Sequence, residues 1–201
     1  MKLRFARAAA WLARLAAPAL AAAWIPAHAT SVLPARLEQL IDDSSVAFEA
    51  TATANRSERD AATNLVVTYT TFEVHDVLKG AVGTTYEIKQ VGGSLPDGFR
   101  YKVDGVPAFT VGQEYVVFLA GVSQLGFSSP IALSQGSFSV QVRNGAKVVR
   151  NGRDFRQMLS QMAPTLPPNA RIKLNTTGPV REWDLDDFKR IVRGHLAGVT
   201  R

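Results

Sequence analysis

Short stretches in which apolar and polar residues alternate fill much of the chain after residue 44. Three of them predict strands. Small and apolar residues alternate over 45–53, the segment 64–78 is rich in β-branched and aromatic residues, and 84–91 forms the return strand. The run 115–119 is wholly apolar, which predicts a strand covered on both faces or bent around a closed barrel. Asn144-Gly145 divides two further alternating stretches, as in a type I′ hairpin.

Alternation within the second of these strands predicts which side chains face the core. Phe72, Val74 and Leu78 share one parity and are expected to be buried. Glu73 and His75 share the other parity and are expected to face solvent.

Other segments predict connections and helices. The polar segment 55–64 predicts a loop or hairpin tip, and 92–107 predicts a long connection containing glycine and proline. Apolar residues at helical spacing predict three short helices: 32–41, 153–162 and 184–196. A proline-rich break is expected over 165–169.

These elements predict a mainly β fold of five or six strands in a meander-like order. A small antiparallel barrel of the OB type, or a sandwich, fits this order, with short helices at the N- and C-terminal ends. We expect a β-barrel domain with a leading helix over 30–163, then a proline-containing linker and C-terminal helix over 164–201.

The first 29 residues have the layout of a cleavable signal peptide. Four basic residues precede an apolar run over 15–25: Lys2, Arg4, Arg7 and Arg14. The small-x-small site Ala27-His28-Ala29 follows, and cleavage is expected after Ala29. The apolar run is too short for a membrane-spanning helix, which needs about 20 residues. The chain is therefore expected to be exported, to the periplasm or the medium, with no transmembrane segment after signal removal.

Removal of the signal changes the electrostatic interpretation. The full chain has a net charge of +6, and the remainder has 19 basic and 17 acidic residues, or +2. This near-neutral balance argues against a nucleic-acid partner. The chain has no cysteine, so no disulfide is expected, and only His75 and His195 remain. A three-histidine zinc site is thereby excluded, and neither a metal nor a cofactor is expected.

His75 is the first candidate for acid–base chemistry. Asp76 should point to the opposite face and cannot orient the ring, whereas Glu73 could pair with it. The sequence contains neither a G-x-S-x-G elbow nor an H-E-x-x-H motif. These observations favour a solvated strand histidine, and no catalytic residue is assigned. His195, near the end of the last predicted helix, is expected on the surface.

An acidic cluster precedes and opens the last predicted helix: Glu182, Asp184, Asp186 and Asp187. Its spacing does not match a calcium-binding EF-hand loop. Asp184 as a helix cap, with acids in the first turn, explains the cluster.

The connection 92–107 is the expected recognition surface. Phe99, Arg100, Tyr101 and Lys102 give it aromatic and cationic character, and long loops on β scaffolds often bind partners. The alternative is that Phe99 and Tyr101 pack over the end of the barrel.

Four segments carry a resemblance to a known group: TYTTFEVHDVLKG, YEIKQVGG, VDGVPAFTVGQEYVVFL and SQGSFSV. In this order, over 45–142, they resemble an uncharacterised family of exported bacterial β-rich proteins. The resemblance implies an extracytoplasmic β domain and no established catalytic residue. A weaker, fold-level similarity is to the netrin-like module of tissue inhibitors of metalloproteases, an OB-type barrel. That module's cysteines are missing here, and the expected N-terminal residue is Thr30, so its inhibitory mechanism does not carry over.

The sequence therefore favours an exported, non-enzymatic β domain that binds a protein or cell-envelope partner. Two alternatives stay open. One is an extracytoplasmic hydrolase that uses His75 with an unrecognised nucleophile, and the other is an inhibitor or escort of a co-exported protease.

Overall fold

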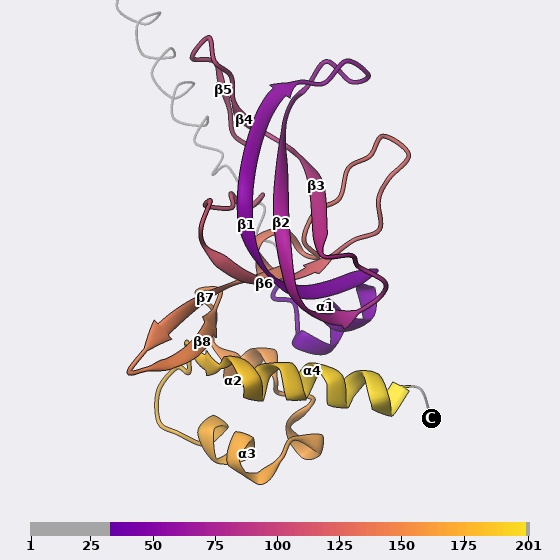
Figure 1. Ribbon diagram of the computed structural model, residues 1–201. Helices are drawn as coiled ribbons and strands as arrows, with labels where there is room; N and C mark the ends of the chain where they lie inside the picture. Colours follow the sequence, from indigo (N-terminus) through magenta and orange to yellow (C-terminus); the bar gives the residue numbers. More distant parts are fainter. Residues whose placement is uncertain (1–32, 200–201) are drawn as a thin grey trace, which may run out of the picture. The chain divides into compact units, whose positions relative to one another are not determined.

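The computed structural model describes residues 33–199, and the expected signal segment, with Ala27 and Ala29, lies outside them. The described part is mainly β, as the sequence predicts, with one seven-stranded antiparallel sheet and a separate two-stranded ribbon (Figure 1). The strands are β1 (Val46–Arg59), β2 (Val66–Lys79), β3 (Thr85–Val91), β4 (Gly93–Ser94), β5 (Arg100–Tyr101), β6 (Glu114–Leu119), β7 (Ser137–Arg143), β8 (Ala146–Arg150) and β9 (Trp183–Asp184). The helices are α1 (Leu37–Asp43), α2 (Phe155–Met158), α3 (Pro168–Leu174) and α4 (Leu185–Val199), with 3-10 turns η2 (Leu133–Gly136) and η3 (Ala163–Thr165).

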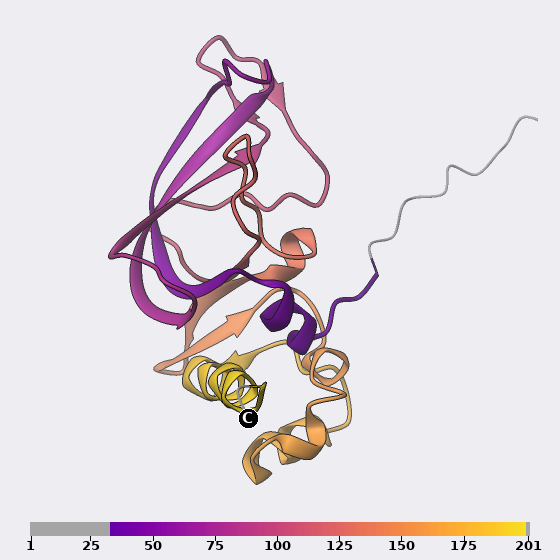
Figure 2. The same cartoon turned by 90° about the vertical axis from the view of Figure 1, so that its right-hand side faces the viewer.

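The large sheet has the strand order β3-β2-β1-β6-β7-β8-β9 and does not close into a barrel. Its two longest strands, β1 and β2, curl strongly along their length (Figures 1 and 2). Their pairing contains three register shifts, and such bulges bend a strand and increase its twist. The sheet is therefore an open, curled structure that fits an open barrel or a sandwich.

The register shifts also change which face a residue occupies. Phe72 is buried, and Val74 packs partly buried, against the apolar core inside the curl. Leu78 instead joins the core on the opposite face, beneath the helices. The expectation that these three side chains share a face was wrong, because simple alternation fails where an extra residue interrupts the ladder.

Strand β6 separates two hydrophobic cores. Tyr115, Val117 and Leu119 lie in the core inside the curl. Val116 and Phe118 lie in the core beneath the helices. The apolar run 115–119 is thus covered on both faces, which confirms one of the two arrangements predicted for it.

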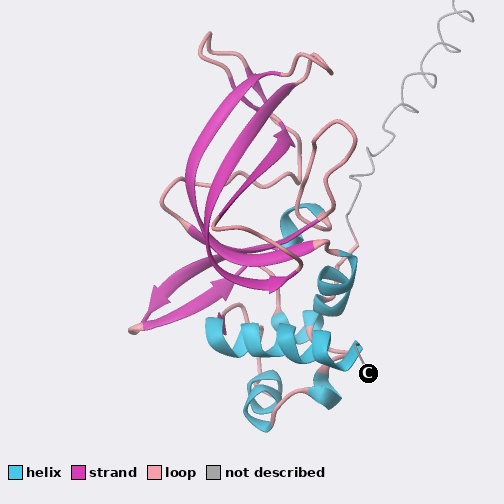
Figure 3. Cartoon of the chain, turned by 45° about the vertical axis from the view of Figure 1, so that its right-hand side comes forward, coloured by secondary structure: helices cyan, strands magenta, loops and turns pink. Residues whose placement is uncertain are grey.

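The helices cover one end of the strands (Figures 1 and 3). Helix α4 contributes Phe188, whose ring centroid lies 4.9 Å from that of Phe138 on β7. The same helix is tied to the sheet by Lys189, whose Nζ lies 2.6 Å from Oε2 of buried Glu49 and 3.0 Å from Oδ2 of Asp76. Over residues 33–199, no helix is both long enough and apolar enough to cross a membrane.

Local signals in the sequence were confirmed where they depend on near neighbours. Asn144 and Gly145 have positive φ angles of 50° and 79°, as a type I′ hairpin requires. Asp184 caps α4, because its Oδ1 accepts a hydrogen bond from the backbone N–H of Asp187 at 2.9 Å.

Several predicted boundaries were wrong. Strand β1 continues to Arg59, into the segment predicted to be a loop, because it pairs with β2 along its whole outer half. Helix α2 ends at Met158, earlier than predicted, and α3 occupies part of the predicted proline-rich break.

The core beneath the helices should respond strongly to truncation. We expect Phe138→Ala to lower the free energy of unfolding by about 3–5 kcal/mol, because a fully buried ring is lost and a cavity remains. Urea denaturation of the purified protein measures this difference. Val142→Ala, on the same strand but 69% exposed, is the control and should change stability by less than about 0.5 kcal/mol. Similar losses in the two variants would contradict the assignment of this core.

Candidate functional site

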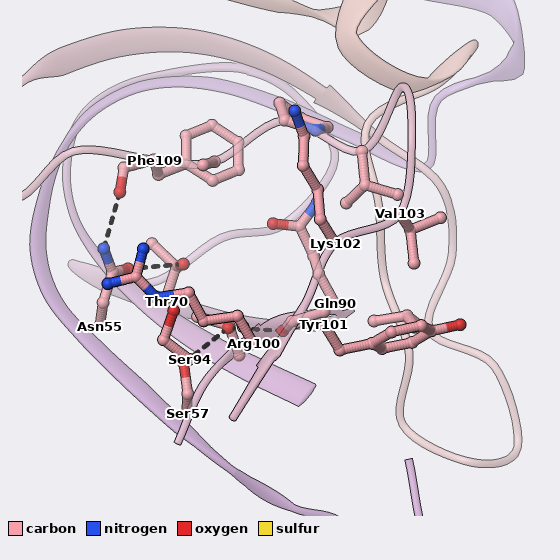
Figure 4. A pocket seen from close by; sticks show the side chains of 17 residues that line it. Asn55, Ser57, Thr70, Gln90, Ser94, Arg100, Tyr101, Lys102, Val103 and Phe109 are labelled. Atoms are coloured by element: carbon pink, nitrogen blue, oxygen red, sulfur yellow. Dashed lines mark hydrogen bonds between the residues drawn. The ribbon is translucent and has the colours of Figure 1, made fainter. Parts of the chain in front are cut away.

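A pocket of about 460 Å³ lies where the connection 92–107 meets the outer ends of β1, β2 and β3 (Figure 4). The connection leaves β3, forms the β4–β5 ribbon and returns to Phe109. Ligand-binding pockets in proteins commonly have volumes of about 300–1,000 Å³, so a pocket of this size can hold a small ligand or part of a larger one.

Gly93 brings the start of this connection close to the strands. Its φ angle is 149°, which glycine adopts far more readily than other residues. A Cβ atom placed on it would lie 2.4 Å from Oγ1 of Thr68 and 2.6 Å from Oγ of Ser57. Only glycine therefore fits where the connection crosses β1 and β2.

Two cross-strand pairs form a polar wall of the pocket. Asn55 lies opposite Thr70, and Ser57 lies opposite Thr68, in the β1–β2 ladder. The Thr70 hydroxyl donates to Oδ1 of Asn55 at 2.8 Å, and Oγ of Ser57 lies 2.8 Å from Oγ1 of Thr68. Phe109 lies next to this wall, and its carbonyl accepts from Nδ2 of Asn55 at 2.6 Å.

Gln90 places a buried amide in this pocket. It is 4% exposed, and its Nε2 has no hydrogen-bond partner among the described residues. Figure 4 shows its side chain rising into the middle of the pocket. An unpaired buried donor costs about 1–3 kcal/mol, so a ligand acceptor at this position would recover that loss. The sequence analysis missed Gln90, because its strand, TYEIKQV, already contains polar and charged residues that hide a buried glutamine.

The connection supplies cations to the same pocket. Arg100, Tyr101 and Lys102 line it, as the sequence analysis grouped them, and their side chains are exposed. Neither Arg100 nor Lys102 has a carboxylate partner within residues 33–199, and no aspartate or glutamate lines the pocket. Phe99, the fourth residue of the predicted group, does not line the pocket but lies under the guanidinium of Arg59, 5.8 Å from ring centroid to Cζ.

A buried ion pair fixes β3 beside the pocket. Nζ of Lys89 lies 2.6 Å from Oδ1 of Asp60, at the β1–β2 turn, and both side chains are nearly buried. The same ammonium donates to the carbonyl of Leu125 at 3.0 Å and lies 4.5 Å from the ring centroid of Phe127. The hydrogen bond from Lys89, with one from Thr63, lowers the pKa of Asp60, and the carboxylate raises the pKa of Lys89.

His75 lies elsewhere, on the exposed surface of β2. Its Nε2 lies 2.8 Å from Oγ1 of Thr51, and no contact joins it to Glu73. Asp76 instead pairs with Lys189 and Arg193 of α4. His195 is partly buried, and its Nε2 lies 2.8 Å from Oδ1 of Asp42 on α1.

The acidic cluster at the start of α4 forms ion pairs. Asp187 pairs with Lys173 and Arg190, and Glu182 lies near Arg143 and Arg150. In the part of the chain that the structure describes, no group of three or more histidine, aspartate or glutamate residues is placed to hold a metal ion.

Comparison with known protein families and with curated proteins finds no match to this chain. The resemblance to exported β-rich proteins and to the netrin-like module therefore stays a prediction. The functional interpretation is based on the geometry of the pocket.

The Lys89–Asp60 pair should make the region beside the pocket sensitive to acid. The pKa of Asp60 is lowered in the folded state, so its contribution to stability is present above about pH 3.9 and is lost as the pH falls below that value. We expect Asp60→Asn to lower the unfolding temperature at pH 7 and to differ much less from the wild type at pH 2.

Thermal denaturation followed by circular dichroism at both pH values measures this effect. Glu58→Gln removes an exposed carboxylate paired with Arg56 and should change little at either pH. An Asp60→Asn variant as stable as the wild type at pH 7 would refute a stabilising role for the pair.

Proposed function

We propose that this chain is an exported, non-enzymatic β domain that binds a protein or cell-envelope partner through the pocket beneath the connection 92–107. One observation carries the proposal: the unpaired cations of Arg100 and Lys102 meet the unpartnered buried amide of Gln90 in a single pocket. A buried donor left without a partner is costly unless a ligand satisfies it, and exposed cations without a carboxylate partner are free to pair with an anionic group.

The chemistry of the pocket supports binding rather than catalysis. Its lining residues include hydroxyl groups but no histidine, aspartate or glutamate that could act as a base toward them. The hydroxyls of Thr68 and Thr70 are already committed to hydrogen bonds with Gly92 and Asn55. Activation of a nucleophile needs an adjacent base, which these residues do not supply.

A hydrolase is the second candidate, and one contact favours it. The 2.8 Å separation of Thr51 Oγ1 and His75 Nε2 is within the range of a nucleophile and its base. A panel of ester, peptide and glycan substrates tests this candidate. Turnover that is lost in His75→Ala, with the fold retained, would overturn the non-enzymatic proposal.

The binding proposal predicts that two cations dominate association with the partner. A variant carrying Arg100→Ala and Lys102→Ala should bind purified cell-envelope material or an exported protein partner about tenfold more weakly or worse. Each charge-assisted hydrogen bond contributes about 1.5–3 kcal/mol, and 1.4 kcal/mol corresponds to a factor of ten. Cosedimentation with envelope material, and affinity capture followed by titration of the captured protein, measure this loss.

The control carries Arg143→Ala and Lys147→Ala, which remove the same charge from the β7–β8 hairpin, where these cations pair with Glu182 and Glu114. This control should bind like the wild type. Equal binding by the Arg100/Lys102 variant and the wild type would exclude the pocket as the recognition site.

A further inference from the structure

We infer that the group bound in this pocket is an acidic carbohydrate, a sugar that carries a carboxylate or phosphate. This inference rests on the proposed function, since it takes the pocket beneath 92–107 as the binding site. It follows from which hydrogen-bonding groups the pocket has already used and which it leaves free.

The polar wall offers acceptors to a ligand. Thr68 donates its only hydroxyl proton to the carbonyl of Gly92 at 2.7 Å, so the bond between Thr68 and Ser57 must be donated by Ser57. Thr70 likewise donates its proton to Asn55. Thr70 is buried, but Ser57 and Thr68 are partly exposed. With their protons committed, these two hydroxyls keep only lone pairs, which accept hydrogen bonds from a ligand that is rich in hydroxyl groups.

On the connection and on β3, the pocket offers hydrogen-bond donors, which need acceptors on the ligand. Arg100 and Lys102 carry only donors, and the Gln90 amide adds a donor, Nε2, that has no partner among the described residues. No carboxylate lines the pocket to neutralise the two cations. Guanidinium and ammonium groups bind carboxylates and phosphates by charge-assisted hydrogen bonds. An anionic group on the ligand therefore fits this side of the pocket.

The remaining surface is apolar and aromatic. Phe109 is buried at the base, and its ring packs edge-on to Phe72 at a centroid distance of 4.9 Å. Val103, Val106 and Pro107 also line the pocket. A sugar ring presents C–H groups on its faces and hydroxyl groups around its edge, so it can contact the apolar surface while its hydroxyls reach the wall.

An acidic peptide fits this arrangement of donors, acceptors and apolar surface less well. Extended peptides bind mainly by main-chain hydrogen bonds to a free strand edge. At the free edge of β3, the carbonyl of Lys89 already accepts a hydrogen bond from the backbone N–H of Ser128 at 3.1 Å. The polar wall of the pocket consists of side chains on β1 and β2. Side-chain hydroxyl acceptors suit ligand hydroxyls better than they suit a peptide main chain.

Calorimetric titration of the purified protein with four probes tests the assignment: a uronate disaccharide, a sugar phosphate, a neutral disaccharide and a tetraglutamate peptide. We expect the uronate or the sugar phosphate to bind, and the stronger of the two identifies the anionic group. The neutral sugar and the peptide should bind about tenfold more weakly or worse.

Gln90→Leu separates a binding role of the amide from a structural one. It replaces an unpartnered buried amide by an apolar side chain, which should keep or raise the unfolding temperature. The same variant should weaken binding of the acidic sugar. Unchanged affinity in Gln90→Leu, or equal affinity for the neutral sugar, would overturn the inference.

The envelope and partner-binding measurements test the pocket as the recognition site separately from the assignment of an acidic carbohydrate as its ligand. If association depends on Arg100 and Lys102 but neither acidic sugar binds, the pocket remains the recognition site and the carbohydrate assignment is wrong. Binding of tetraglutamate in preference to the sugars would identify an acidic protein segment instead. If association does not depend on the two cations, both proposals fail.

Discussion

Strand β6 has no solvent-facing side, and the rest of the fold depends on this constraint. Its residues 115–119 alternate between the core inside the curled strands and the core beneath the helices. Because interiors are closely packed, neither core can be rearranged without disturbing the other across this strand. Strand β1 pairs with β6 only as far as Thr51, so its outer half is free to curl with β2 away from the helices.

The pocket is a consequence of that curl. The side chains inside the curl change in character along the strands. They are aromatic around Phe72 and Phe109. Toward the outer ends they become polar, in the pairs Asn55–Thr70 and Ser57–Thr68. A fold selected only for stability would fill this end with apolar groups. The unpaired buried amide of Gln90, beside two cations without a carboxylate partner, is instead typical of a binding site.

Sequence reasoning succeeded where the determining contacts are local. The Asn144-Gly145 turn, the Asp184 cap and the apolar run of β6 each depend on a few neighbouring residues. Of the four residues predicted as a recognition surface, Arg100, Tyr101 and Lys102 line the pocket and Phe99 does not, and their binding role stays a prediction. Sequence reasoning could not place Leu78, because bulges set by pairing with a distant strand reverse the parity. The unpaired amide of Gln90 and the Lys89–Asp60 ion pair likewise depend on segments far apart in the chain.

The most direct test of the pocket is the nuclear magnetic resonance of its own side chains. During titration of the ¹⁵N-labelled protein with a uronate disaccharide, we expect the side-chain NH₂ signals of Gln90 to shift, together with the Nε signal of Arg100. Signals from His75 and the surrounding surface of β2 should stay unchanged. Shifts confined to the His75 surface, with Gln90 and Arg100 unaffected, would contradict the assignment of this pocket as the recognition site.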